Sequence, residues 1–304
     1  MCFSNRLPLA IAITFMSASP LLARTSSSST TLIVPPDGLL IAEVAGKPAN
    51  LVMVADSGSA PILNATEAKR LGIGTGWIGL SVVVKVGPVP VKGSTGVFPY
   101  RVGGMGVKRR GAWFERDIVQ GQSGMIGPGA VTQPVVTFRL RAALPGERTF
   151  FLPLTDKGVA GMGTLIGNLF VQFDPLRSLS MATAAAGADL AREYQGHFVG
   201  DGRREAMRFG ITRPVRNMVL AQPMRIGELA LSTVGVRFLD YGNSGSIPDA
   251  THDPDEIVVT GRKGTSKSYR TLHLGADALR TCSSLTFDKA HKVISLSCSL
   301  RGSR

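Results

Sequence analysis

The chain has 304 residues, enough for one large domain or two of ordinary size with a substantial core. Its 36 glycines and 18 prolines, against 6% aromatic residues, favour many turns and short strands over long helices. The formal net charge of +13 invites a nucleic-acid interpretation, but the densest basic cluster, Lys108-Arg109-Arg110, is short and has no DNA- or RNA-binding motif around it. We therefore expect no specific nucleic-acid partner, and peripheral contact with an anionic surface fits the charge at least as well.

The N-terminal segment has the pattern of a secretory signal peptide. Arg6 precedes an apolar run from Leu7 to Met16, and small residues follow as far as Ala23. We predict a signal peptide over residues 1–23, with an N-terminal anchor helix as the alternative, and a Ser/Thr-rich linker over residues 24–37. The protein is then periplasmic or secreted. The segment Asp253–Lys263, which locally resembles the N-terminal segment of TonB-dependent outer-membrane receptors, fits the periplasm.

Removal of the signal peptide leaves two cysteines, Cys282 and Cys298, and an oxidising compartment favours their pairing. A turn centred on Ala290 would place residues whose numbers sum to 580 opposite each other, and these two cysteines satisfy that sum. Opposed positions in a non-hydrogen-bonded pair come close enough for a disulfide. The sequence therefore predicts a disulfide across a terminal β-hairpin.

Short apolar runs separated by Gly and Pro predict an all-β fold with a few short helices. The clearest expected strands are Leu39–Val44, Leu51–Ala55, Leu80–Val86, Val135–Leu140 and Leu169–Phe173. Asn64 or Thr66 could cap a short helix that ends near Arg70, and Ala182–Ala191 reads as a second helix.

Four markers recur in the same order along the chain and predict an internal duplication whose halves meet near residue 155. The first is an apolar strand that ends in an aspartate, at Asp56 and again at Asp174. The other three are matched pairs of segments: Lys85–Val91 with Arg225–Leu231, Ile126–Val131 with Leu274–Leu279, and Val136–Phe138 with Leu285–Phe287.

The most informative stretch is Asp56-Ser57-Gly58-Ser59, which follows a buried strand at a sharp turn. A carboxylate there is costly to desolvate unless neighbours bind it or chemistry uses it. An Asx turn between two strands is the simpler interpretation. The order of an apolar strand, the D-S-G-S turn, a second short strand and then Ala68-Lys69-Arg70-Leu71-Gly72-Ile73 resembles the active-site segment of retropepsin-like aspartic peptidases.

The resemblance extends over residues 38–299 and implies two pseudo-symmetric, retropepsin-like β-barrel lobes. We expect a first lobe over residues 38–155 and a second, degenerate lobe over residues 156–304. The family chemistry would be that of an aspartic endopeptidase acting on a peptide or protein substrate, without a metal or another cofactor. Two carboxyl groups share a proton and activate a water molecule.

The resemblance assigns roles to individual residues. Asp56 matches the first catalytic position, Ser57 the hydroxyl that braces the loops across the lobes, and Gly58 and Ser59 the supporting turn. Asp174 is the candidate for the second catalytic position, and we expect burial to raise the pKa of Asp56. Asp174 departs from the pattern because Pro175-Leu176-Arg177 follows it, and Arg177 would favour an ionised neighbour.

Several alternatives remain open at this stage. Asp174 can also be read as a hairpin aspartate like Asp288, and the fold could bind extended peptides without cleaving them. The duplication favours a monomer, although a homodimer of the first lobe could also build an active site. The longer flap is expected in the second lobe, near Phe209–Thr212.

Overall fold

The computed structural model of the chain describes residues 30–74, 80–240, 244–249 and 270–299. Strands dominate in these ranges and the helices are short, so the predicted all-β class is confirmed. No helix in the described ranges is long and apolar enough to cross a membrane. The predicted signal peptide and the segment 253–263 lie outside the described residues.

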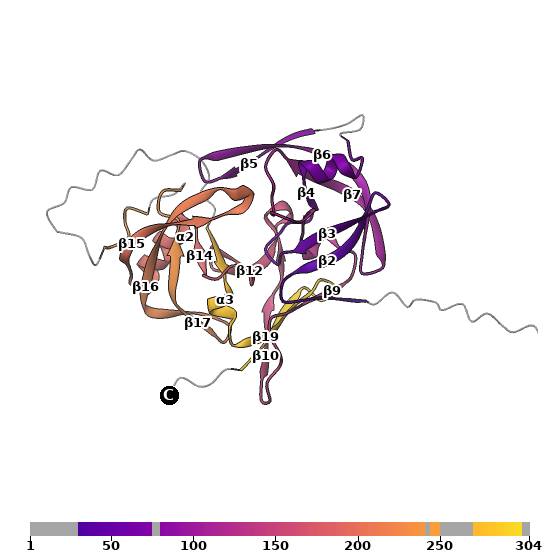
Figure 1. Ribbon diagram of the computed structural model, residues 1–304. Coiled ribbons are helices and arrows are strands. Elements are labelled where there is room, and N and C mark those ends of the chain that lie inside the picture. Colours follow the sequence, from indigo (N-terminus) through magenta and orange to yellow (C-terminus); the bar gives the residue numbers. More distant parts are fainter. Residues whose placement is uncertain (1–29, 75–79, 241–243, 250–269, 300–304) are drawn as a thin grey trace, which may run out of the picture.

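The first sheet is built from residues of the first half of the chain and lies at the right of Figure 1. A further pairing of its first strand with β6 closes six of its strands into a barrel. In spatial order its strands are β2 (Leu39–Val44), β3 (Lys47–Met53), β8 (Gly124–Ile126), β4 (Ile62–Asn64), β7 (Met105–Phe114), β6 (Val89–Val102) and β5 (Leu80–Val86).

The second sheet is built from the second half of the chain and lies at the left of Figure 1. In spatial order its strands are β11 (Thr155–Asp156), β12 (Met162–Ile166), β13 (Leu169–Phe173), β18 (Thr271–Leu274), β14 (Met181–Ala182), β17 (Leu229–Val236), β16 (Thr212–Ile226) and β15 (Gly196–Ala206).

The two sheets repeat one strand order. Strands β2-β3-β8-β4-β7-β6-β5 correspond one by one to β12-β13-β18-β14-β17-β16-β15. Each of the six neighbour pairs also has the same sense in both sheets, parallel for β3/β8 and β4/β7 as for β13/β18 and β14/β17, and antiparallel for the others. One topology therefore occurs twice along the chain.

A third sheet joins the two halves below them in Figure 1. The matched segments of the predicted duplication meet here, because Thr137 and Thr286 pair across β9 and β19 with their hydroxyl oxygens 2.9 Å apart. The rings of Phe138 and Phe287 lie 6.0 Å apart on the buried side. The strands of this sheet, in spatial order, are β1 (Thr31–Val34), β9 (Val135–Arg139), β19 (Cys282–Asp288), β20 (Val293–Cys298) and β10 (Arg148–Pro153).

Strand β1 corrects the prediction of a linker over residues 24–37. Thr31–Val34 pairs in parallel with β9, and Val34 is fully buried. Leu32 and Val34 point into the core, so the apolar alternation in Thr-Leu-Ile-Val outweighs the polar composition of the residues before it.

Short helices connect the strands. The α-helices are α1 (Ala65–Arg70), α2 (Ala184–Tyr194) and α3 (Ala276–Leu279), and the 3₁₀ turns are η1 (Pro128–Ala130), η2 (Gly158–Ala160) and η3 (Arg208–Gly210). The predicted helix at Ala182–Ala191 begins later, at Ala184, because Ala182 belongs to β14 and the Thr183 hydroxyl caps the first turn. Ala184, Ala185, Ala186 and Ala191 are buried, and the helix packs against β15 and β16 of the second sheet.

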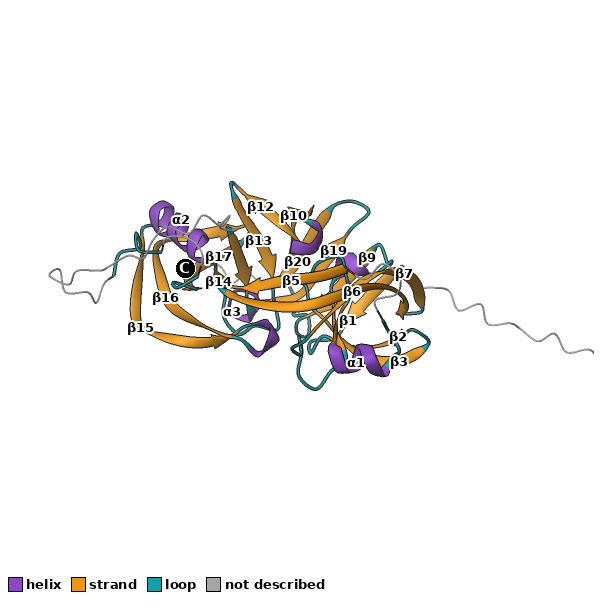
Figure 2. Cartoon of the chain, turned by 90° about the horizontal axis from the view of Figure 1, so that it is seen from above, coloured by secondary structure: helices purple, strands orange, loops and turns teal. Residues whose placement is uncertain are grey.

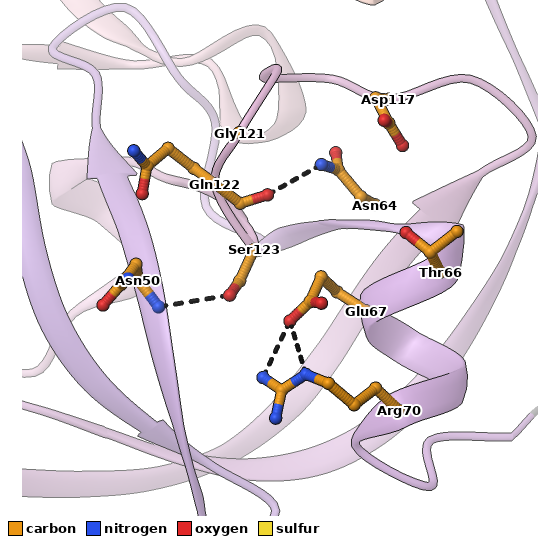
Figure 3. A pocket seen from close by; sticks show the side chains of 9 residues that line it. All are labelled: Asn50, Asn64, Thr66, Glu67, Arg70, Asp117, Gly121, Gln122 and Ser123. Carbon is orange, nitrogen blue, oxygen red and sulfur yellow. Dashed lines mark hydrogen bonds and ion pairs between the residues drawn. The ribbon is translucent and has the colours of Figure 1, made fainter.

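The residue before α1, Asn64, holds a loop rather than the helix. Its amide nitrogen donates to the carbonyl oxygens of Val119 and Gln122, both at 2.8 Å, and its amide oxygen accepts from the Ile118 amide. Figure 3 shows Asn64 beside Gln122 in the polar hollow that α1 and this loop enclose. Both the oxygen and the nitrogen of this buried amide are hydrogen-bonded, so the role of Asn64 in the hollow is to hold the loop in place.

Each half sends one hairpin into the other, which Figure 2 shows for β5 and β6 from above. The β15–β16 tip carries Phe209, whose ring lies 4.9 Å from that of Phe114 in the first half. In return, the β5–β6 turn places Gly87 against the Arg213 and Asp240 side chains, where a Cβ would collide with the Asp240 carboxylate. The two halves are therefore held together at two hairpin tips as well as by the shared sheet.

The strand order corrects one of the matched segment pairs. Lys85–Val91 forms the β5–β6 turn, whose counterpart is the β15–β16 turn at η3. Arg225–Leu231 forms the next hairpin turn, between β16 and β17. Both segments share a hydrophobic-Gly turn, with φ of +59° at Gly87 and +58° at Gly227, and this common local requirement explains the false match.

The predicted disulfide is confirmed. Cys282 and Cys298 are bonded across the β19–β20 hairpin. The predicted register was wrong by one residue along most of the hairpin, since Ser284 faces Ser297 and Leu285 faces Leu296. An irregularity at Ser283 restores the facing positions of the two cysteines.

Replacement of both cysteines by alanine should lower the free energy of unfolding by roughly 3 kcal/mol, because the unfolded chain regains the entropy of a closed loop of about 15 residues. Denaturant titration measures the change. A reducing agent should reproduce the loss in the wild-type protein and leave the double variant unaffected. Equal stability of wild type and variant would contradict this expectation.

Candidate functional site

Asp56 lies on a tight turn directly after β3. The Val54 amide continues the ladder by donating to the Ile126 carbonyl at 2.9 Å, and the Ser57 amide donates back to the Val54 carbonyl at 3.2 Å. The turn packs on Gly127, where a Cβ would lie only 2.6 Å from the Ser57 carbonyl oxygen. The segment Ile126-Gly127 therefore permits the close approach that buries Asp56.

The second half of the chain supports the same turn. The Gln172 side-chain amide on β13 donates to the Asp56 carbonyl at 3.1 Å and to the Ala160 carbonyl at 2.7 Å. Gly161 lies against the turn as well, since a Cβ there would be 2.6 Å from the Asp56 carbonyl oxygen. The backbone of Asp56 is thus positioned by residues from both halves.

Ser57 does not brace the two halves as the resemblance implies. Its side chain is buried, but its hydroxyl makes no hydrogen bond within the described part of the chain. At this turn, hydrogen bonds between the halves come instead from Gln172 and from the Ser59 amide, which donates to the Gly158 carbonyl at 3.2 Å.

Two side chains from the second half bind the Asp56 carboxylate. Arg208 at the hairpin tip donates to Oδ1 at 2.6 Å, and His273 Nδ1 lies 3.1 Å from Oδ2. The Asp56 side chain is only 6% exposed. Burial by itself raises the pKa of Asp56, but Arg208 and His273 outweigh it and hold that pKa well below its usual range. The predicted direction of the shift was therefore wrong, because the partners come from elsewhere in the fold.

Asp174 lies close enough to Asp56 for the two charges to interact, although it does not line the cleft that holds Asp56. Its carboxylate is nine-tenths buried and accepts from Arg177 Nε at 3.1 Å. Burial raises the pKa of Asp174, the charge of Asp56 raises it further, and Arg177 offsets part of the rise. Two neighbouring carboxyl groups thus have pKa values displaced in opposite directions.

Asp174 is nevertheless not the backbone counterpart of Asp56. The Asp174 amide donates to the Leu274 carbonyl at 2.8 Å, which is the bond that Val54 makes to Ile126 in the first half. The next turn repeats too, since the Arg177 amide donates to the Asp174 carbonyl as Ser57 does to Val54. In the repeated topology, Asp174 is therefore equivalent to Val54, and Leu176 is equivalent to Asp56. Asp174 lies two residues before the position that is equivalent to Asp56.

Asp56 lies in a cleft of about 850 Å³ between the two halves. The predicted turn residues Ser57, Gly58 and Ser59 line this cleft with it. The hairpin tip expected near Phe209 contributes to the lining through Met207, Arg208 and Phe209. The cleft shares no lining residue with the polar hollow of Figure 3.

Sequence reasoning missed Arg208 and His273. His273 stands two residues before Gly275, at the position that Met125 occupies before Gly127 in the first half. The sequence signal for His273 was a polar residue at a position where the first half has an apolar one. Nothing local marks Arg208, which meets Asp56 across a separation of 152 residues.

No group of three His, Cys, Asp or Glu side chains suited to a metal ion occurs among the described residues. Comparison with protein-family models gives no match, and no curated protein has a similar sequence.

The Arg208→Gln variant tests the ion pair at Asp56. Because the folded-state pKa of Asp56 lies below its unfolded value of about 3.8, the pair stabilises the fold above that pH and its contribution is lost as the pH falls further. We expect Arg208→Gln to lower the free energy of unfolding by about 2 kcal/mol at pH 6 and by much less at about pH 2.

Arg204→Gln is the matched control, because Arg204 lies on the same hairpin and donates to the carbonyl and hydroxyl oxygens of Thr212. Its effect on denaturant unfolding should not depend on pH in this range. A pH-independent effect of Arg208→Gln would contradict the assignment.

Proposed function

We propose that the chain is an exported aspartic endopeptidase built from two retropepsin-like lobes. The repeated strand order, the D-S-G turn after β3 and the glycine that packs behind it support this assignment. The lobes are the two halves that contribute the first and second sheets, with the third sheet joining them. The substrate is a peptide or protein that lies in the cleft, and the protein acts as a monomer.

The observation that carries the proposal is the pair of buried carboxyl groups with opposite pKa displacements. Arg208 and His273 favour the ionised form of Asp56, whereas burial and the Asp56 charge favour the protonated form of Asp174. An ionised carboxylate can accept a proton from an attacking water while a neutral carboxyl donates to the scissile carbonyl. The directions of the two pKa shifts are those that this division of roles requires.

In the structure, the Asp56 carboxylate has no free oxygen that could accept a proton from water. Both Asp56 carboxylate oxygens are engaged, Oδ1 by Arg208 and Oδ2 by His273. Arg208 is 38% exposed and projects from a hairpin tip, so this contact can be released by movement of the β15–β16 hairpin. Water reaches Oδ1 after that release, and in this scheme His273 remains to keep Asp56 ionised.

A second candidate function is binding of extended peptides without hydrolysis. The presence of Leu176 at the backbone counterpart of Asp56 favours it, because the symmetric second aspartate is missing. Under this alternative, Arg208 and His273 neutralise Asp56 permanently and Asp174 serves the Arg177 turn alone.

Hydrolysis of an unfolded protein substrate by three Asp→Asn variants tests the proposal. We expect Asp56→Asn and Asp174→Asn each to lower kcat/KM by about 10³-fold or more, because each removes one half of the acid–base pair. The matched control is Asp288→Asn, a hairpin aspartate that binds His291 away from the cleft, and it should retain activity. Circular dichroism confirms that each variant is folded.

Activity that survives Asp174→Asn would contradict the acid pair. Binding of peptides by a wild-type protein that cleaves none of them between pH 3 and pH 8 would favour the second candidate. A rise in kcat for Arg208→Gln would identify Arg208 as the group that closes the site.

A further inference from the structure

We propose that the cleft selects peptides in which acidic side chains flank an apolar residue. The inference rests on the proposed function only in taking the ligand to be a peptide, and it applies equally if the peptide is bound and not cleaved. It comes from the imbalance of charge in the cleft and from the chemistry of the surfaces between the charged groups.

The cleft lining carries far more positive than negative charge. Asp56 is the acidic residue among its lining residues, and Arg208 and His273 already bind it. The cationic residues of the lining are Lys85, Arg109, Arg110, Arg177, Arg208 and Arg237. An anionic ligand would therefore enter a site with an unbalanced positive potential.

Two of these cations come from β7 in the first half. Arg109 donates to the Gly129 carbonyl at 3.2 Å and Arg110 to the Thr95 hydroxyl at 2.9 Å. Both partners are neutral, and within the described ranges neither guanidinium is paired with a carboxylate. Each therefore retains donors for a carboxylate of the ligand.

Two more cations of the lining, Arg177 and Arg237, come from the second half. The Asp240 carboxylate binds Arg237 at 3.1 Å and also Arg213 at 2.6 Å, so one carboxylate serves two guanidinium groups. Arg177 contacts Asp174, whose pKa is raised by burial and by Asp56. Burial also lowers the pKa of Arg237, because the nearby Asp240 carboxylate only partly offsets the loss of water around this cation. A carboxylate of the ligand would add a second negative charge beside Arg213 and Arg237.

Apolar side chains line the space between these cations. They include Ile62, Val82, Val84, Val86, Phe114 and Phe209. Strand β5 borders the cleft through Val82–Val86 and is the edge of its sheet, with β6 as its single partner strand. An extended peptide can pair with such an edge and place alternate side chains on the apolar surface. A polyanion without apolar groups would leave that surface unused.

Binding of labelled ten-residue peptides to the wild-type protein tests the selection. The probes share a central Val-Phe pair flanked by Glu, by Gln or by Lys, and fluorescence anisotropy gives Kd while mass spectrometry reports whether each peptide stays intact. We expect the Glu peptide to bind at least about tenfold more tightly than the Gln peptide and the Lys peptide to bind weakest. Equal affinities for the Glu and Gln peptides would overturn the proposal.

Arg110→Gln should weaken binding of the Glu peptide about three- to tenfold and leave the Gln peptide unchanged. Arg101→Gln is the matched control, because Arg101 is an exposed arginine on β6 that does not line the cleft. Equal loss with both variants would mean that net charge, and not the cleft, attracts the peptide. A single-stranded oligonucleotide that binds as tightly as the Glu peptide would also overturn the proposal.

The outcomes separate this inference from the proposed function. Tight binding of an intact Glu peptide would support acidic selection and contradict hydrolysis. Cleavage of the Gln and Glu peptides with equal kcat/KM would support hydrolysis and contradict acidic selection.

Discussion

The structure depends on the burial of one carboxylate, Asp56, between the two halves of the chain. A buried anion is tolerated only where other groups bind it. Asp56 obtains its partners, Arg208 and His273, from the opposite half, and its backbone is held by Gln172 from that half as well. The first half therefore cannot bury this residue favourably by itself, and the same contacts that stabilise the fold create the site.

The β15–β16 hairpin carries one of the partners of Asp56, so its movement would change the surroundings of this carboxylate. The β15–β16 tip is fastened by an apolar contact, Phe209 on Phe114, and by an ionic contact, Arg208 on Asp56. The shared third sheet and the disulfide at Cys282 fix the base of the two halves. Phe209 belongs to a buried apolar cluster, so movement of the hairpin tip would cost this apolar packing as well as the ion pair at Asp56.

Sequence reasoning succeeded where local chemistry decides the structure. The strands Leu39–Val44 and Leu80–Val86 have the predicted bounds, and the turn at Asp56 was found from its motif. It failed where register or distant contacts decide. Every residue of β13 is buried, so its apolar run has no period to fix the alignment of Asp174, which was placed two residues from its true counterpart. Arg208 and His273 approach Asp56 only in the folded chain.

The central claim is that Asp56 and Asp174 form one interacting acid pair. Carbon-13 NMR titration of the Asp174 carboxyl in the wild-type protein and in Asp56→Asn tests it most directly, because the variant removes one charge and keeps the shape of the side chain. We predict that the pKa of Asp174 lies above its usual value in the wild type and falls in Asp56→Asn, where the neutral amide no longer repels the Asp174 anion. An Asp174 pKa that is the same in both proteins would contradict the pair.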